Sequence, residues 1–332
     1  MTHPFRRTLL LAAVAAAAVI LTSCSGPEQV QRAPNPVPEM TYEFTMDPGV
    51  RIHVNRPTFP DPDKRTLVLF YALPNGNTIE MTIGRHLSEG LDWHYNIQHI
   101  GAQVRFLRNE LSDRNITVVY LETEQRSWPA WRKANAENNA FLIRRIFRTI
   151  ADQQPPGTEF QLAGHSGGGS FLNGFLNAYD SVPAEVSRIS YLDANYSYDD
   201  SLGHGRKLVQ WLRADTAHKL SVFAYDDREI VLNGKKVIGP DGGTFRATRR
   251  MLEYFRDQTD IRSFQDSTIL QYVAYNGRSR FIVHTNPENR ILHTVLVETN
   301  GYIHSVLFQT PYEERNYRFS GPRAYNQYID GP

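Results

Sequence analysis

Apolar residues along most of the chain fall into runs of two kinds, and the two kinds alternate. Short runs rich in β-branched and aromatic residues, such as 66–71 and 116–121, predict buried strands. Longer segments in which apolar residues recur every three or four positions, such as 96–111 and 141–150, predict amphipathic helices. By the same criteria the remaining runs predict strands at 50–54, 159–163, 188–192 and 220–225, and helices at 167–178 and 207–217.

A regular alternation of strand and helix indicates parallel strands that are joined by right-handed crossovers. The sequence therefore predicts an α/β fold, a doubly wound and mostly parallel sheet, in a single domain that spans residues 41–332. The alternation stops in the last third of the chain, where 281–284 and 294–298 are expected to form the strands of a hairpin. The C-terminal part is therefore predicted to be an irregular addition.

The first 23 residues have the pattern of an export signal, because Arg6 and Arg7 precede an apolar run at 9–21. This run is shorter than the roughly 20 residues that a membrane-spanning helix needs. It ends in Leu21-Thr22-Ser23-Cys24, which resembles a bacterial lipobox. The resemblance implies cleavage before Cys24 and attachment of acyl chains such as palmitate to that cysteine. The alternative is an ordinary cleavable signal that happens to be followed by a cysteine.

Residues 24–40 separate this leader from the predicted domain. They contain four prolines and few large apolar residues, a composition that favours an extended tether over packing. Ser25 is not the aspartate that resembles an inner-membrane retention signal. We therefore expect a protein anchored by lipid in the cell envelope, at the outer membrane if the source has two membranes.

The composition of the 332 residues excludes several classes of protein. With 11% aromatic residues and a formal net charge of +1, the chain is expected to fold and offers no electrostatic footprint for nucleic acid. The chain has one cysteine, Cys24, which excludes an internal disulfide and a cysteine-based zinc site. The histidines and acidic residues show no metal-ligand spacing, so no metal and no cofactor are expected.

The chemically most specific motif is Gly164-His165-Ser166-Gly167-Gly168, between the predicted strand 159–163 and a predicted helix. A G-x-S-x-G sequence between strand and helix is typical of a nucleophile elbow, in which a strained turn exposes the serine hydroxyl. The backbone N–H of Gly167 would then face the oxyanion that develops during attack by Ser166. The alternative is a glycine-rich turn that only packs tightly; a phosphate-binding loop is excluded because its lysine is missing.

On this motif the chain resembles the α/β-hydrolase superfamily, over roughly residues 50–308. The resemblance implies a catalytic serine, acid and histidine in that order along the chain. It places the acid after the strand 220–225, where Asp227 aligns best and Asp226 is the second choice. Asp193, at the end of the strand 188–192, is an outside candidate, and a simple turn at Asp226-Asp227 is the alternative.

The resemblance also implies a histidine in a closing Gly-x-x-His segment, which His304 fits because it follows Gly301. A structural role for His304 is the alternative. The other downstream histidines fit less well. His165 is constrained within the elbow, His204 and His218 precede the acid, and His284 and His293 lie within predicted strands.

A second oxyanion donor is expected in the loop at 72–78. This loop contains Asn75-Gly76 where the family commonly has His-Gly, so the N–H of Asn77 is the expected donor and a simple turn is the alternative. In the loop after residue 121, Trp128 and Trp131 would either stack on a substrate or pack into the protein.

These features together predict an exported serine hydrolase that cleaves carboxylic esters through Ser166, Asp227 and His304 and an acyl-enzyme. The expected substrate is a small-molecule or polysaccharide acyl ester. One alternative is a peptidase on the same fold. The other is a non-catalytic envelope lipoprotein that retains the fold, which predicts a misplaced acid or histidine.

Overall fold

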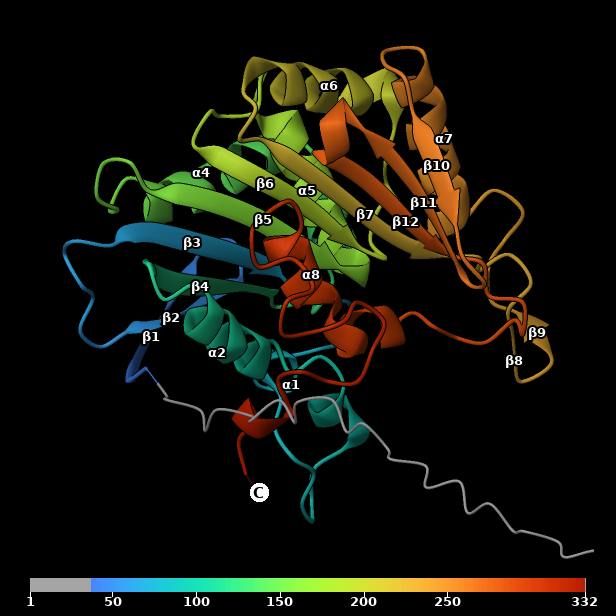
Figure 1. Ribbon diagram of the computed structural model, residues 1–332. Helices are drawn as coiled ribbons and strands as arrows, with labels where there is room; N and C mark the ends of the chain where they lie inside the picture. The colour runs from blue at the N-terminus through green and yellow to red at the C-terminus, as the bar shows by residue number, and fades with distance from the viewer. Residues whose placement is uncertain (1–36, 332) are drawn as a thin grey trace, which may run out of the picture. The chain divides into compact units, whose positions relative to one another are not determined.

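The computed structural model of the protein describes residues 37–331, and a ten-stranded sheet runs through this part (Figure 1). The central strands β4, β3, β5, β6, β7 and β12 are parallel, whereas both edges of the sheet are antiparallel. In spatial order the strands are β1 (Glu39–Met46), β2 (Val50–Pro57), β4 (Arg114–Thr123), β3 (Arg65–Ala72), β5 (Glu159–His165), β6 (Val186–Leu192), β7 (Lys219–Tyr225), β12 (Ser279–His284), β11 (Ile269–Ala274) and β10 (Arg262–Gln265).

Helices cover both faces of this sheet, and a small hairpin of β8 (Val231–Leu232) and β9 (Lys235–Lys236) lies apart from it (Figure 1). The predicted α/β class with a doubly wound, mostly parallel sheet is confirmed. The helices are α1 (Ile79–Ile83), α2 (Ile100–Glu110), α3 (Trp128–Ala134), α4 (Asn139–Ala151), α5 (Gly169–Ala178), α6 (His204–Ala214), α7 (Thr244–Arg256) and α8 (Tyr302–Leu307).

The core divides into two layers because successive side chains of a strand point to opposite faces of the sheet. In β3, Val68 and Phe70 pack into the layer that contains residues of α4, α5, α6 and α7. Leu67 and Leu69 pack into the opposite layer, which contains residues of α2 and α8. Burial on both faces explains why the central strands are continuous apolar runs in the sequence.

The predicted hairpin at the C-terminal end is wrong in one strand. β12 is confirmed at 279–284, but its hairpin partner is β11, which precedes it, and β12 also joins the sheet parallel to β7. Residues 294–298 instead begin a wide helical turn, in which the N–H of Glu298 donates to the carbonyl of Thr294 over 3.0 Å. Because short apolar runs fit a strand or a helix equally well, the sequence could not distinguish the two.

The N-terminal predictions concern residues that lie mostly outside the described range. The signal peptide at 1–23 and the lipidated Cys24 are both outside it. Glu39 and Met40, the last residues of the predicted tether, belong to β1. No helix within residues 37–331 is long and apolar enough to cross a bilayer.

Candidate active site

Ser166 lies at the turn between β5 and α5, where the parallel strands end. Its φ of 52° is in the left-handed region, which residues other than glycine seldom adopt. A Cβ atom at Gly168 would lie 2.1 Å from the carbonyl oxygen of Ala72, and one at Gly164 would lie 2.7 Å from the carbonyl carbon of Gly168. The strained turn therefore depends on glycine at these positions, as expected for a nucleophile elbow.

Asp193 emerges next to Ser166 at the end of the neighbouring strand. His165 and Leu192 are register partners in the parallel pair of β5 and β6, so the residues that follow them leave the sheet side by side. Asp193 is fully buried, and its own φ of 48° is also left-handed. Its backbone N–H donates to the carbonyl of Phe223 in β7, which fixes this turn to the sheet.

His293 brings an imidazole to this carboxylate from the loop that follows β12. Its Nδ1 lies 2.5 Å from Oδ2 of Asp193. Nδ1 therefore carries a proton, and this N–H donates a hydrogen bond to the carboxylate. The side chain is 26% exposed, whereas the carboxylate is inaccessible to solvent. The histidine therefore has a fixed tautomer in which Nε2 is free to accept a proton.

The loop of His293 is held to the nucleophile turn through its backbone. His165, the residue before Ser166, donates from Nε2 to the carbonyl oxygen of His293 over 3.0 Å, and the two rings lie 4.8 Å apart. Nδ1 of His165 lies 3.2 Å from the side-chain amide of Gln98, which the Tyr71 hydroxyl also contacts. Burial lowers the pKa of His165 well below its usual value, so this ring is a neutral structural link.

Asp227, the acid expected from the sequence, lies beside Asp193 and forms no hydrogen bond with a described histidine. Its Oδ2 accepts the backbone N–H of Thr244 over 2.8 Å, at the first turn of α7. The Thr244 hydroxyl donates to Asp193 and lies 3.4 Å from Oδ2 of Asp227. Burial raises the pKa of Asp227 to about 6, and the adjacent carboxylate of Asp193 adds to this rise. The site thus contains two coupled carboxylates.

Asp226, the second choice for the acid, is directed elsewhere. Its carboxylate accepts from Nε of Arg228 over 2.8 Å and from Nη2 over 2.6 Å. Because consecutive residues of an extended chain face opposite sides, Asp226 and Asp227 could not both reach the site.

His304 is not brought to Ser166 or to any carboxylate in this cluster. It lies on α8, where its Nδ1 hydrogen-bonds with the Tyr317 hydroxyl over 3.0 Å and its ring lies 4.9 Å from that of Phe319. Burial lowers the pKa of His304 to about 3, so the imidazole is neutral in this apolar surrounding. The Gly-x-x-His likeness therefore identified a core histidine, and the predicted pairing of Asp227 with His304 is not formed.

The loop after β3 lies beside Gly167, the residue that follows Ser166. A Cβ atom at Gly167 would lie 1.9 Å from Oδ1 of Asn75, so the exposed Asn75 amide rests directly on the Gly167 backbone. The predicted donor Asn77 is buried, and its N–H lies 3.5 Å from the carbonyl of Pro74, within its own turn. The structure thus places the Asn75 side chain beside Gly167 and turns the Asn77 N–H away.

Trp128 and Trp131 are core residues. Both are almost fully buried, and their indole N–H groups donate to the backbone carbonyls of Leu121 and Pro48. Stacking of a substrate on either indole is therefore excluded.

Sequence reasoning missed His293 and Thr244 as members of this site. His293 was obscured by the strand predicted at 294–298, and Thr244 carries no motif at all. Asp193 had one usable signal, its position at the end of a buried strand next to the elbow strand. Within the described residues no three His, Cys, Asp or Glu side chains are grouped so that they could hold a metal ion.

Comparisons with known proteins bear on the fold. No family model and no curated protein matches this sequence. Among solved structures, that of FAE is 11% identical over 86% of this chain and 92% of that chain, with a TM-score of 0.50. The feruloyl esterase module from Clostridium thermocellum is 11% identical with the same coverage and a TM-score of 0.48. A siderophore hydrolase from Aspergillus nidulans is 10% identical over 86% of this chain and 97% of that chain, with a TM-score of 0.39. At 11% identity, the likeness to the FAE structure shows a shared fold alone.

Proposed function

Because the chain has the α/β-hydrolase fold, we propose that it is a serine hydrolase of carboxylic esters with Ser166, His293 and Asp193 as its catalytic residues. The observation that carries this proposal is the 2.5 Å contact between His293 and Asp193, next to a serine held at a left-handed φ. A partly exposed histidine bonded to an inaccessible carboxylate is an arrangement suited to general base catalysis.

In the proposed reaction Oγ of Ser166 attacks the ester carbonyl carbon while Nε2 of His293 accepts the hydroxyl proton. The imidazolium then gives this proton to the leaving alcohol, and an acyl-enzyme remains on Ser166. A water molecule, deprotonated by the same nitrogen, attacks the acyl carbon and releases the carboxylic acid. Asp193 keeps the proton on Nδ1 and stabilises the imidazolium, since no described Lys or Arg neutralises this buried carboxylate.

The oxyanion would be held by the backbone N–H of Gly167 and the side-chain amide of Asn75. Gly167 lies at the beginning of the helical segment, where N–H groups are free to donate to an anion. The Asn75 side chain is exposed, and rotation of its amide would present the NH₂ group to the same point as a second donor. This assignment replaces Asn77 with Asn75.

The location remains part of the proposal. The leader and Cys24 would attach the enzyme by lipid to the cell envelope, so its substrate would be an external acyl ester, either a small molecule or an acylated polysaccharide. The described residues include a paired acid and histidine, which weighs against the non-catalytic alternative. No observation favours a peptidase over an esterase.

The test is hydrolysis of short nitrophenyl esters and of the matching nitroanilides by the purified protein. We expect turnover of the esters, weak or no turnover of the amides, and covalent labelling of Ser166 by a fluorophosphonate. Ser166→Ala should remove both turnover and labelling and melt at the same temperature, because the hydroxyl is not part of the core. Ester turnover that survives in Ser166→Ala would refute the proposal.

A further inference from the structure

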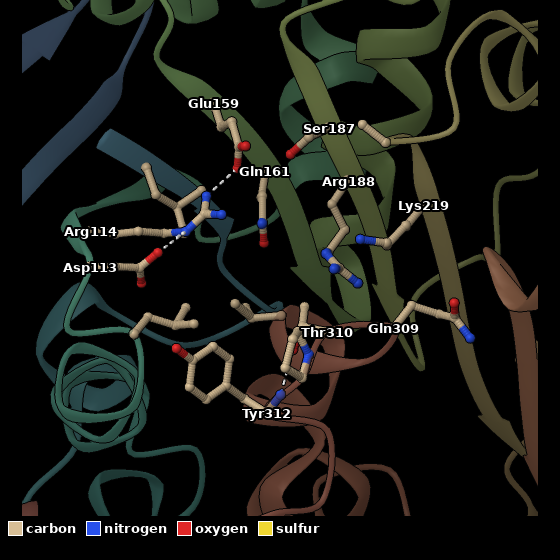
Figure 2. A pocket seen from close by; sticks show the side chains of 15 residues that line it. Asp113, Arg114, Glu159, Gln161, Ser187, Arg188, Lys219, Gln309, Thr310 and Tyr312 are labelled. Carbon is tan, nitrogen blue, oxygen red and sulfur yellow. Dashed lines mark hydrogen bonds and ion pairs between the residues drawn. The ribbon is translucent and has the colours of Figure 1, made fainter. Parts of the chain in front are cut away.

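A cavity of about 400 Å³ lies at the end of the sheet where the parallel strands begin, opposite to Ser166. Figure 2 shows the side chains that line it. Four of its charged residues stand near the starts of strands: Arg114 in β4, Glu159 in β5, Arg188 in β6 and Lys219 in β7. Arg188 lies in β6 and precedes Asp193, the residue after this strand, by five positions, which corresponds to roughly 16 Å of extended chain. The cavity is therefore distinct from the candidate active site.

Arg188 is a buried cation with an unused donor. Its side chain is among the least accessible of the charged groups, with the residue 3% exposed. Nη2 donates to the carbonyl of Phe308 over 3.1 Å and the guanidinium packs on the Phe308 ring, but Nη1 has no partner among residues 37–331. An unpaired buried donor on a charged group costs free energy, and a ligand that accepts from it would remove that cost.

Lys219 places a second cation next to Arg188. The two residues are register partners in the parallel pair of β6 and β7, and both side chains point into the same part of the cavity (Figure 2). Burial lowers the pKa of Lys219 to about 8, and the Arg188 charge adds to the effect. Like charges at paired positions of a sheet destabilise it unless an anion lies between them.

The nearby carboxylates are already paired with other arginines. Oε2 of Glu159 lies 2.5 Å from Nη1 of Arg114, and Asp113 lies 3.8 Å from the same guanidinium. Glu313 forms an ion pair with Arg280. Within the described part of the chain, neither Arg188 nor Lys219 has an ion pair of its own, so the cavity carries an uncompensated positive charge.

Part of the remaining wall is apolar, beside the polar side chains of Gln161, Ser187, Gln309 and Thr310. The volume of the cavity is within the range of pockets for small organic ligands and exceeds the space that an inorganic ion fills. The apolar lining consists of Leu67, Leu111, Val306, Pro311 and the ring of Tyr312.

We propose that this cavity binds a small organic anion whose carboxylate or phosphate group is held by Arg188 and Lys219. The forked guanidinium offers the free Nη1 to one oxygen, and the ammonium pairs with another. The apolar part of the ligand packs against Leu111, Val306 and Tyr312. This binding site is independent of the proposed ester hydrolysis.

The test is thermal denaturation of the whole protein with benzoate, phenyl phosphate, inorganic phosphate or uncharged benzyl alcohol, at a constant ionic strength set with chloride. We expect benzoate or phenyl phosphate to raise Tm with a saturable dose dependence, and benzyl alcohol to leave it unchanged. Tighter binding of benzoate would identify a carboxylate ligand, and tighter binding of phenyl phosphate would identify a phosphate ligand. Inorganic phosphate binding as tightly as phenyl phosphate would refute the organic ligand, and no response to any anion would overturn the proposal.

Two variants locate the response. Lys219→Gln should fold, because it removes a repelling charge. It should weaken the binding of benzoate or phenyl phosphate, whichever binds more tightly to wild type, by roughly tenfold or more, with ester turnover unchanged. Lys64→Gln is the matched control, since Lys64 is an exposed lysine just before β3 at the same end of the sheet. Wild-type affinity in Lys219→Gln, or an equal loss in Lys64→Gln, would show that the anion binds elsewhere.

The pH dependence gives an independent readout. An anion stabilises the charged form of Lys219, so affinity should begin to fall as the pH rises above about 8. Burial also lowers the pKa of Arg188 to about 9, so in Lys219→Gln the fall in affinity should begin about one pH unit higher. The charged groups that face Lys219 are Arg188 on β6, Glu159 on β5, Arg114 on β4 and Arg278 before β12.

Discussion

Nδ1 of His293 lies 2.5 Å from a carboxylate oxygen of Asp193, a residue 100 positions earlier in the chain. Asp193 follows β6, whereas the resemblance to α/β-hydrolases places the acid after β7, at Asp227. Thr244 bridges the two carboxylates, so the histidine faces a pair of acids of which it contacts one. The direct contact supports the proposed orienting role of Asp193, and mutations can separate the two acids.

Asp193→Asn should lower kcat by a factor on the order of 10⁴, because His293 would lose the acceptor that fixes its tautomer. Asp227→Asn should lower kcat by less than roughly tenfold, because Asp227 makes no hydrogen bond to His293. The side-chain oxygen of the asparagine can still accept the Thr244 N–H. The measurement is kcat on one ester for both variants. Asp226→Asn is the control and should match wild type. A large loss in Asp227→Asn with a mild one in Asp193→Asn would return the role to Asp227.

His293→Ala and His304→Ala should differ in their effect on kcat. His293→Ala should reduce kcat by about 10⁴-fold or more because it removes the proposed base, and should lower Tm because the buried Asp193 carboxylate loses a hydrogen-bond donor. His304→Ala should leave kcat of the folded protein unchanged and lower the free energy of unfolding by ~2–3 kcal/mol, since it leaves a cavity beside Phe319. Kinetics and urea unfolding of both variants provide the comparison. An active His293→Ala would contradict the proposed base.

Asp227 should make stability depend on pH in a defined window. Its pKa is raised from 3.8 to about 6 by burial and by Asp193, so the folded chain holds a proton there that the unfolded chain has already lost. Its stabilising contribution is full below about 3.8 and is lost as the pH rises through about 6. At neutral pH, Asp227→Asn should therefore be more stable than wild type by ~2 kcal/mol.

The measurement is the difference in free energy of unfolding between wild type and Asp227→Asn over a series of pH values. The difference isolates this carboxyl group, because the buried histidines contribute equally to both proteins. It should shrink as the pH falls from neutrality towards 4. A difference that stays constant across this range would contradict the raised pKa.

Asn75→Ala should lower kcat by roughly 10²–10³-fold, the usual cost of removing one oxyanion donor, with KM changed little. Asn77→Ala should cost stability rather than turnover, since the side chain is buried in the turn. The readout is kcat and KM with melting temperatures for both variants. An Asn75→Ala variant with the kcat of wild type would contradict the side-chain donor.

Cys24→Ala should release the protein from the membrane fraction of cells and leave kcat unchanged, because the cysteine belongs to the predicted anchor. Fractionation followed by immunoblotting of wild type and variant gives the result. Ser25→Ala is a matched control and should remain in the membrane fraction. A Cys24→Ala protein that also remained there would refute the lipid anchor.

The structural elements that are determined by residues close together in the sequence could be predicted from the sequence. The elbow is encoded within five residues around Ser166, and the central strands are visible because both of their faces are buried. Each predicted helix and strand before residue 285 is present, with ends shifted by a few residues.

The partners of Ser166 could not be predicted because loops from three different strands bring them together. The order of serine, acid and histidine fits His293 as well as His304, and Asp193 as well as Asp227. The choice depends on where the loop after β12 is held, and this is set by Leu292 packing on Tyr225 and Ile230 and by the bond from His165. Neither contact has a sequence motif.

The bond between His165 and the loop uses the carbonyl of His293, an atom group that every amino acid possesses. This bond therefore does not depend on which side chains flank the histidine. The exposed residues 287–291 can change in sequence without displacing the imidazole, as long as Leu292 keeps its packing. Substrate preference can thus diversify in this loop, in natural relatives or in a directed-evolution library, while the catalytic geometry is preserved.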